Sequence, residues 1–296
     1  MKALNDWFAR LWIRIIKSMA HTPIERRAFY ARIIASVLWY AIPKRRKVTL
    51  TNLRLCFPEK TEAERVEIAK STYRHLARAA LDHGVLWAGT AEEVDAMVRF
   101  DGIKEMLDTE ERNIIVVVPH FAGLDAAGIG IGLHVRCCTL YQKQSNQAWD
   151  DAARAGRSRF SEPVLIAKSD RNDLRQVIRA MRQGLPFYYL PDMDHGARNS
   201  VFVPFFGVQA ATLPMVSRLA RLTKSKVVFM VSEMTDDGYV VHVSDFWKDF
   251  PTDDYVADTR RVTAELEKWI LRLPDQYMWL HRRFKTRPEG EPSVYD

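Results

Sequence analysis

The chain has 296 residues, of which 47% are hydrophobic, so it can bury a substantial core as one large domain or two small ones. Its 44 Lys and Arg residues exceed its 37 Asp and Glu residues, which favours anionic partners such as phospholipid headgroups, phosphorylated glycolipids or nucleic acid. The three cysteines form no C-x-x-C pair, which argues against a disulfide framework or a zinc site and indicates chemistry in a reducing compartment, the cytoplasm.

The N-terminal segment is predicted to be helical and membrane-associating. Over residues 4–19 apolar side chains, among them Trp7, Phe8 and Trp12, recur at helical spacing, and most polar positions between them are basic. This pattern suits a membrane interface, although a core-packing helix fits it equally well. The next apolar stretch, Ala28–Ile42, is shorter than the roughly 20 residues that a spanning helix needs. We expect residues 1–43 to form this segment and residues 44–296 to form one further domain.

After Pro58 the sequence alternates between helical and strand-like patterns. Thr61, followed three residues later by Glu64, predicts a capping box at the start of a helix that reaches about Trp87. Short β-branched and aromatic runs predict strands at Ile114–Val118, Cys137–Tyr141, Pro186–Leu190, Val201–Phe205, Val227–Ser232 and Tyr239–Ser244. Further helices are expected at about Asp125–Leu133, Asp170–Gln183, Leu213–Leu222 and Asp254–Leu273. This alternation predicts an α/β fold with a mixed, mostly parallel sheet flanked by helices.

A histidine follows the first of these strands. His120 comes directly after Pro119, where catalytic groups gather in open α/β sheets. Asp125, in the first turn of the next helix, is expected to hold the ring so that its other nitrogen can take a proton from an alcohol. The pair would then act like the base and orienter of a serine-hydrolase triad, with a substrate hydroxyl as the nucleophile. The H-x-x-x-x-D spacing is weak by itself, because a packed loop histidine is the commoner case.

Two further polar clusters extend the candidate site. Arg157 and Arg159 suit bidentate contact with a phosphate or a developing oxyanion, and the alternative is a solvated surface. Asp192 and Asp194 lie just beyond a predicted strand, where they can hold an arginine such as Arg157 or accept a substrate hydroxyl. Turn chemistry is the alternative there. Glycines 128, 130 and 132 lack the G-x-G-x-x-G spacing and indicate close helix packing instead of dinucleotide binding.

Several sequence motifs together resemble those of one protein family. From about residue 45 to 290 their order is similar to that of the bacterial lipid A secondary acyltransferases, of the lauroyl and myristoyl type, within the lysophospholipid acyltransferase superfamily. The motifs are Asn52 to Glu59 (NLRLCFPE), His120 to Asp125, Asp192 to Gly196 (DMDHG), Val201 to Gly207 (VFVPFFG) with Ala211 and Thr212, and Gln276 to Pro288 (QYMWLHRRFKTRP). Many relatives have Glu at the position of Asp125, and Gln and Tyr at those of Met193 and His195, and the shorter carboxylate of Asp125 still matches the broader H-x-x-x-x-D pattern.

The resemblance implies a glycerolipid acyltransferase-like fold and transfer of a fatty acyl chain from acyl carrier protein, or from acyl-CoA, to the hydroxyl of a hydroxyacyl chain on a lipid A precursor. It implies work at the cytoplasmic face of the inner membrane, with no metal and no cofactor. It assigns His120 as general base and Asp125 as its orienting carboxylate. One of Arg157 and Arg159, with one of Asp192 and Asp194, would complete the site.

The C-terminal motif is basic and aromatic, with Arg282, Arg283 and Lys285 close together. Rings beside cations suit single-stranded nucleic acid, but no nucleic-acid-binding motif accompanies them. We therefore expect these three residues to contact lipid phosphates or the membrane, and we expect no nucleic-acid partner. The rival interpretations are an acyltransferase acting on another membrane lipid, such as a lysophospholipid, aminolipid or phosphoinositide mannoside, and a non-catalytic lipid-binding membrane protein. In the last case the polar residues around His120 would have no reason to converge.

Overall fold

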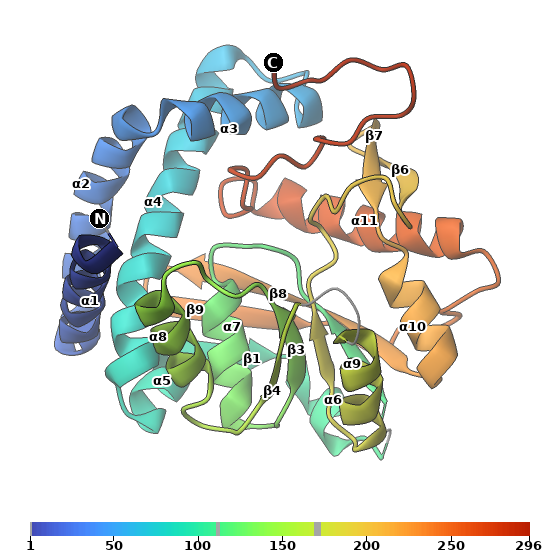
Figure 1. Ribbon diagram of the computed structural model, residues 1–296, viewed down its shortest axis with the longest axis horizontal. Helices are drawn as coiled ribbons and strands as arrows, with labels where there is room; N and C mark the ends of the chain where they lie inside the picture. The colour runs from blue at the N-terminus through green and yellow to red at the C-terminus, as the bar shows by residue number, and fades with distance from the viewer. Residues whose placement is uncertain (1, 111–112, 169–172) are drawn as a thin grey trace.

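The computed structural model describes residues 2–110, 113–168 and 173–296, and Figure 1 shows its arrangement. The helices before the sheet are α1 (Lys2–Ser18), α2 (Ile24–Ala41), α3 (Pro43–Cys56), α4 (Glu62–Ala88) and α5 (Ala91–Met97). The remaining helices are α6 (Ile103–Asp108), α7 (Leu124–Gly130), α8 (Gln147–Arg157), α9 (Asp173–Arg182), α10 (Met215–Thr223) and α11 (Tyr255–Arg272). Short 3₁₀ turns follow α1 at Met19–His21 and α7 at Ile131–Leu133.

In the described chain seven strands form one sheet in the order β1-β9-β8-β2-β5-β3-β4. They are β1 (Val98–Asp101), β2 (Ile114–Val117), β3 (Cys138–Tyr141), β4 (Val164–Ala167), β5 (Phe187–Tyr189), β8 (Lys226–Thr235) and β9 (Gly238–Val243). All neighbours pair in parallel except the β8–β9 hairpin. The predicted α/β fold with a mostly parallel sheet is therefore confirmed.

One predicted strand belongs elsewhere. The run from Val201 to Phe205 is β6, which pairs with β7 (Val208–Thr212) in a separate antiparallel ribbon packed against α11. The capping box at Thr61 is confirmed, because its hydroxyl accepts from the Glu64 amide while the Glu64 carboxylate accepts from the Thr61 amide. The helix predicted from Asp170 begins in a stretch outside the described residues, and α9 begins at Asp173.

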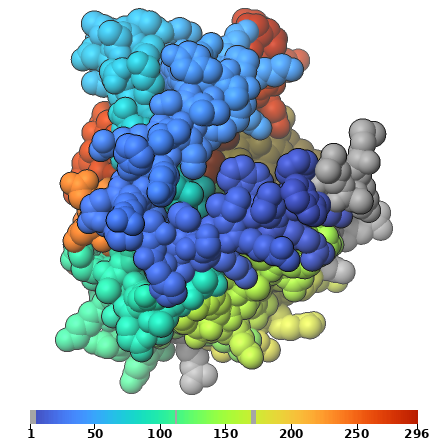
Figure 2. Space-filling view, turned by 90° about the vertical axis from the view of Figure 1, so that its left-hand side faces the viewer, coloured from blue at the N-terminus to red at the C-terminus, as the bar shows by residue number. Residues whose placement is uncertain are grey.

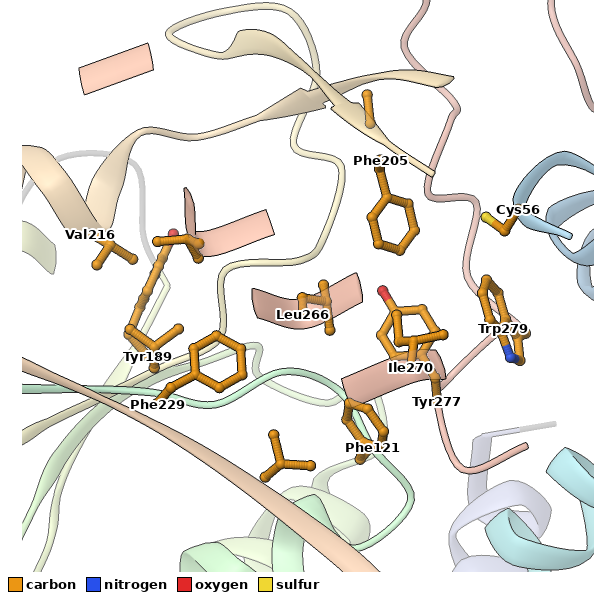
Figure 3. Close-up of a cluster of buried hydrophobic side chains, with 14 of the residues drawn as sticks. Cys56, Phe121, Tyr189, Phe205, Val216, Phe229, Leu266, Ile270, Tyr277 and Trp279 are labelled. Atoms are coloured by element: carbon orange, nitrogen blue, oxygen red, sulfur yellow. The ribbon is translucent and has the colours of Figure 1, made fainter. Parts of the chain in front are cut away.

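Alternating side chains of β2 enter two hydrophobic cores, one on each face of the sheet. Ile115 and Val117 join a core with residues of α2, α9, α10 and α11, whereas Ile114 and Val116 join one with residues of α4, α5 and α7. Figure 3 shows part of the first core, where Phe121, Phe205 and two rings of one C-terminal segment, Tyr277 and Trp279, meet Leu266 and Ile270 of α11. These two cores make the sheet the middle layer of the fold.

The helices α1 and α2 lie along one flank of the molecule beside α4 (Figures 1 and 2). Ala31, Ala35 and Trp39 of α2 are buried in the same core as β2. A division of the chain at residue 43 stays a prediction. Within the described residues, none of the helices combines the length and the apolar character that a membrane crossing requires.

Candidate active site

Sheet register places two predicted site residues side by side. Strands β2 and β5 are parallel neighbours, with Val117 opposite Tyr189. His120 and Asp192 each lie three residues beyond that matched pair, so the two loops leave the same carboxyl edge of the sheet together. The candidate site is built at this edge, as expected for an open α/β sheet.

The carboxylate of Asp192 holds His120 at two points. Its Oδ1 lies 2.7 Å from the Nδ1 of the imidazole, and its Oδ2 accepts the backbone amide of His120 at 3.0 Å. Burial would raise the pKa of Asp192, but the positive charge and the hydrogen bonds of His120 outweigh it and hold that pKa well below its usual range. The ionised carboxylate fixes a proton on Nδ1, which leaves Nε2 as the nitrogen that can accept one.

The expectation that Asp125 orients His120 is corrected by this geometry. The Oδ1 of Asp125 accepts from Nε and Nη2 of Arg157 at 3.0 and 2.8 Å, and its Oδ2 lies 3.1 Å from Nε2 of His83. Burial opposes ionisation of Asp125, but Arg157 first and His83 second lower its pKa well below the usual range. Asp125 lies in the first turn of α7 and faces α4 and α8, so Arg157 is held by Asp125 and not by Asp192 or Asp194.

His83 was not singled out in the sequence. Its Nδ1 lies 2.7 Å from the carbonyl oxygen of Ala79 and its Nε2 faces Asp125, so both ring nitrogens face acceptors. Asp125 therefore has a partner on each side, Arg157 and His83. A histidine in the middle of the helix α4 carries no local signal, because its role depends on the packing of α4 against α7.

Two glycines allow the elements around the site to pack closely. A Cβ on Gly156 of α8 would lie 2.1 Å from the ring of Trp87, so only glycine lets α8 approach α4 closely enough to bring Arg157 to Asp125. A Cβ on Gly123, which precedes α7, would lie 2.2 Å from the hydroxyl of Ser232 on β8. The lack of a side chain at these two positions therefore lets α8 approach α4 and lets the loop that carries His120 approach β8.

A cavity of about 370 Å³ opens beside His120, in the range of small-molecule sites. Asp125, Arg157, Lys168 and His195 line it together with His120. Its remaining wall is largely apolar and comes from α7, β3, β4 and β5. The apolar and aromatic lining includes Leu124, Gly128, Ile131, Cys137, Leu140, Tyr141, Pro163, Leu165, Tyr188, Tyr189 and Leu190. The cavity thus joins a polar end containing the histidine to a wall suited to an alkyl chain.

The cysteines do not supply a nucleophile here. Cys137 and Cys138 are buried, as expected of strand residues, and neither forms a disulfide. Burial raises the pKa of both thiols to about 12, so neither ionises near neutral pH. Although Cys137 lines the cavity, it contributes apolar surface there.

The C-terminal motif holds the loop that carries His120. The Met278 amide donates to the His120 carbonyl oxygen at 2.9 Å, and the Ala122 amide donates to the Gln276 carbonyl oxygen at 2.8 Å. Phe121 and Tyr277 form a β-bridge between these two hydrogen bonds and pack edge to face (Figure 3). The motif therefore fixes the backbone of the loop that carries His120.

The prediction that this motif contacts lipid phosphates is wrong for Arg283. That side chain is 1% exposed and donates to the Ala211 carbonyl oxygen and to the Thr212 hydroxyl, which ties the motif to β7. Arg282 is exposed and lies over the ring of Tyr295, and Lys285 is exposed. A buried guanidinium can serve structure only, so any phosphate contact would fall to the other two cations.

Two further predicted site residues also have structural partners. Arg159 donates to the carbonyl oxygens of Leu86 and Gly89, so it caps the end of α4 and does not line the cavity. Asp194 accepts from the amide of Gly196 and from the amide and hydroxyl of Thr286. Of the two arginines, Arg157 therefore borders the cavity, and of the two aspartates, Asp192 holds His120.

The fold and the site together define an α/β enzyme with a histidine–carboxylate pair at the carboxyl edge of its sheet, beside a largely apolar cavity. The family model of the bacterial lipid A biosynthesis acyltransferases matches residues 1–286, and the chain belongs to that family. It is therefore an acyltransferase of lipid A biosynthesis, which implies a lipid A precursor as its lipid substrate.

Curated relatives from Escherichia coli (strain K12) span nearly all of the chain. The lipid A biosynthesis lauroyltransferase is 34% identical over 257 residues, covering 85% of this chain and 83% of that protein. The palmitoleoyltransferase is 29% identical and covers 98% and 94%, and the myristoyltransferase is 29% identical and covers 98% and 90%. Among solved structures, the 1-acyl-sn-glycerophosphate acyltransferase from Thermotoga maritima aligns over 85% of this chain and 98% of its own, with 10% identity and a TM-score of 0.42.

Proposed function

We propose that this enzyme transfers a fatty acyl chain from an acyl carrier protein thioester to the hydroxyl of a hydroxyacyl chain on a lipid A precursor. His120 is the general base and Asp192 is its orienting carboxylate. The observation that carries the proposal is the 2.7 Å contact between Nδ1 of His120 and Asp192 at the polar end of a largely apolar cavity. A non-catalytic lipid-binding protein would not need charged groups gathered around one imidazole.

In the proposed step Nε2 of His120 takes the proton of the acceptor hydroxyl while that oxygen attacks the thioester carbonyl carbon. The buried charge of Asp192 stabilises the imidazolium that forms. When the tetrahedral intermediate collapses, the carbon–sulfur bond breaks and His120 gives its proton to the leaving thiolate. The products are an ester and a free thiol, and no acyl-enzyme is needed.

Arg157 is proposed to bind a negative charge on the substrate. Its Nε and Nη2 donate to Asp125, while Nη1 has no hydrogen-bond partner among the described residues. The side chain is 30% exposed and lines the cavity. A guanidinium that is positioned in this way can bind the developing oxyanion or a phosphate of either substrate. Asp125 and His83 then act as positioning residues.

The apolar wall of the cavity is proposed to hold the acyl chain, and Gly128 makes this testable. A Cβ there would meet its nearest atom, the Tyr188 hydroxyl, at 3.6 Å, so a methyl group fits without strain. A leucine would extend into the cavity. We expect Gly128→Leu to shift the preferred donor toward chains shorter by about two to four carbons, since each methylene excluded forfeits about 0.8 kcal/mol of burial.

The measurement compares kcat/KM across acyl carrier protein thioesters of increasing chain length. Gly128→Ala is the matched control, and its preference should equal that of the unmodified enzyme. An unchanged optimum in the leucine variant, with the protein folded, would mean that the acyl chain lies elsewhere.

The helices α1 and α2 are proposed to attach the enzyme to the cytoplasmic face of the inner membrane. Large apolar side chains on them point into solvent, with Trp7 58% and Tyr40 75% exposed. The others include Phe8, Leu11, Trp12 and Ile15 on α1 and Phe29, Tyr30, Ile33 and Val37 on α2. Figure 2 faces this flank. Such a surface, flanked by cations, suits an interface and not water.

This flank also adjoins the site. Asp6 of α1 accepts a hydrogen bond from Asn146, the N-cap of α8, and Arg157 ends that same helix. An enzyme held to the bilayer by α1 would therefore have its cavity near the lipid surface, where both a glycolipid and a fatty acyl chain are met.

The substrate assignment is tested with the purified full-length chain. Acyl carrier protein thioester and acyl-CoA are offered in turn, with a lipid A precursor and a lysophospholipid competing as acceptors. We expect transfer to the lipid A precursor with the carrier-protein thioester preferred. Preferential acylation of the lysophospholipid would contradict the proposed acceptor, and preference for acyl-CoA would contradict the proposed donor.

A further inference from the structure

A second, polar cavity lies between α2 and α4, away from His120. It has a volume of about 630 Å³ and shares no lining residue with the first cavity. The residues that line it are Arg32, Ala35, Ser36, Trp39 and Tyr40 of α2, and Lys70 and Arg74 of α4. Three of these carry positive charge and none carries negative charge, so the cavity is suited to an anion.

Helical spacing explains how these residues meet. Arg32, Ser36 and Tyr40 are four residues apart along α2, and Lys70 and Arg74 are four residues apart along α4, so each set forms one row. The two helices pack side by side (Figure 1). The buried side chains of Ala35 and Trp39 lie between the rows and give the cavity an uncharged base.

The side chains of the two arginines make no contact that would stabilise the fold. Lys70 pairs with Glu67 at 3.0 Å, but the exposed guanidinium groups of Arg32 and Arg74 have no hydrogen-bond, ion-pair or ring partner among the described residues. By contrast, the guanidinium groups of Arg65 and Arg260 are tied to carbonyl oxygens and to a carboxylate, respectively. A guanidinium fork facing a cavity fits the oxygens of a phosphate group, to which it can donate twice.

The surroundings of the cavity indicate which phosphate it takes. Phe29, Ile33 and Val37 form a second row on α2, and each side chain is more than half exposed. Each arginine or serine of the polar row is one position from a member of this apolar row, which places the rows about 100° apart around the helix. One molecule that offers a phosphate to the first row and alkyl chains to the second is a phospholipid.

We propose that the cavity between α2 and α4 binds the phosphate of an anionic membrane phospholipid, whose acyl chains lie along the apolar row of α2. The proposal rests on the membrane contact of α1 and α2 proposed above. It adds a lipid site that is separate from the catalytic cavity. Arg32 and Arg74 hold the phosphate from opposite helices, so the lipid also fixes how α2 faces the bilayer.

The test measures binding of the full-length chain to vesicles by flotation, with phosphatidylcholine alone or with added phosphatidylglycerol. The pocket variant Arg32→Gln/Arg74→Gln is compared with Arg26→Gln/Lys44→Gln, which removes two exposed charges of the same flank from outside the cavity. We expect phosphatidylglycerol to strengthen binding of the unmodified protein by about tenfold or more, and the pocket variant to lose most of that gain. The control variant should keep most of it.

A charge-conserving variant separates a site from diffuse attraction. Arg32→Lys/Arg74→Lys keeps the charge but loses the fork, so it should also lose most of the phosphatidylglycerol gain. Equal losses in the pocket and control variants, or full retention by the lysine variant, would overturn the proposal. Inorganic phosphate, at an ionic strength matched with chloride, should not displace the protein, and displacement would identify a soluble phosphate as the ligand instead.

Failure of the wider membrane proposal looks different. In that case the unmodified protein would float with neither kind of vesicle, whereas failure of the lipid site alone leaves binding that phosphatidylglycerol does not strengthen. Far-ultraviolet circular dichroism and thermal unfolding of each variant check that the helices remain folded.

Discussion

Replacing His120 with alanine should abolish acyl transfer while the protein stays folded. The imidazole lines the polar end of the cavity, Asp192 holds its Nδ1, and loss of a general base alone costs roughly 10²–10⁴-fold. The ring lies at the surface of the cavity and is not part of either hydrophobic core. The measurement is kcat with acyl carrier protein thioester and lipid A precursor, beside the thermal unfolding midpoint.

The matched control for this variant is His134→Ala. That histidine packs against Phe100 after the 3₁₀ turn that follows α7 and does not line the cavity. It should keep near-normal kcat. Near-normal activity of a folded His120→Ala protein would show that another group takes the proton, and the proposed mechanism would then be wrong.

Replacing Asp192 with asparagine should reduce kcat by about 10²-fold or more, because a general base with the wrong tautomer or without its counter-charge is disabled. Both oxygens of Asp192 accept from donors, one from the ring and one from the backbone amide of His120. An asparagine must turn its own NH₂ group toward one of the two. It therefore either loses the backbone contact or favours a proton on Nε2, and in both cases the neutral amide no longer stabilises the imidazolium.

Asp194→Asn provides the comparison within the same loop. Its carboxylate contacts Gly196 and Thr286 but not His120, so this variant should lower thermal stability while kcat falls less than about tenfold. If the two variants lost activity equally while folded, the loop as a whole and not the Asp192 carboxylate would be responsible. The pair thus settles which aspartate orients the histidine.

Local patterns were sufficient for much of the fold. The capping residues Thr61 and Glu64 marked the start of α4, and the β-branched run before Pro119 marked a strand that both hydrophobic cores bury. These features depend only on residues that are close together in the sequence. The strand β4 is short and only partly buried, and the sequence does not predict it because its formation depends on pairing with β3.

The site required tertiary information. The sequence places Asp125 nearer to His120 than Asp192 is, and only the pairing of β2 with β5 brings the more distant carboxylate to the ring. The motifs of the resemblance pointed to the right regions, but several members serve structure. Asn52 donates to the carbonyl oxygens of Trp279 and His281, and Arg283 reaches Ala211 and Thr212, so these motifs hold one another together.

If the enzyme adds one acyl chain to a lipid A precursor, the mass of lipid A depends on it, and mass spectrometry measures that mass. Lipid A is compared from cells with the gene, without it, and with the His120→Ala form. The proposed activity predicts that the last two lack the same single secondary acyl chain, whose mass also gives the chain length. Lipid A of identical mass in all three would contradict it.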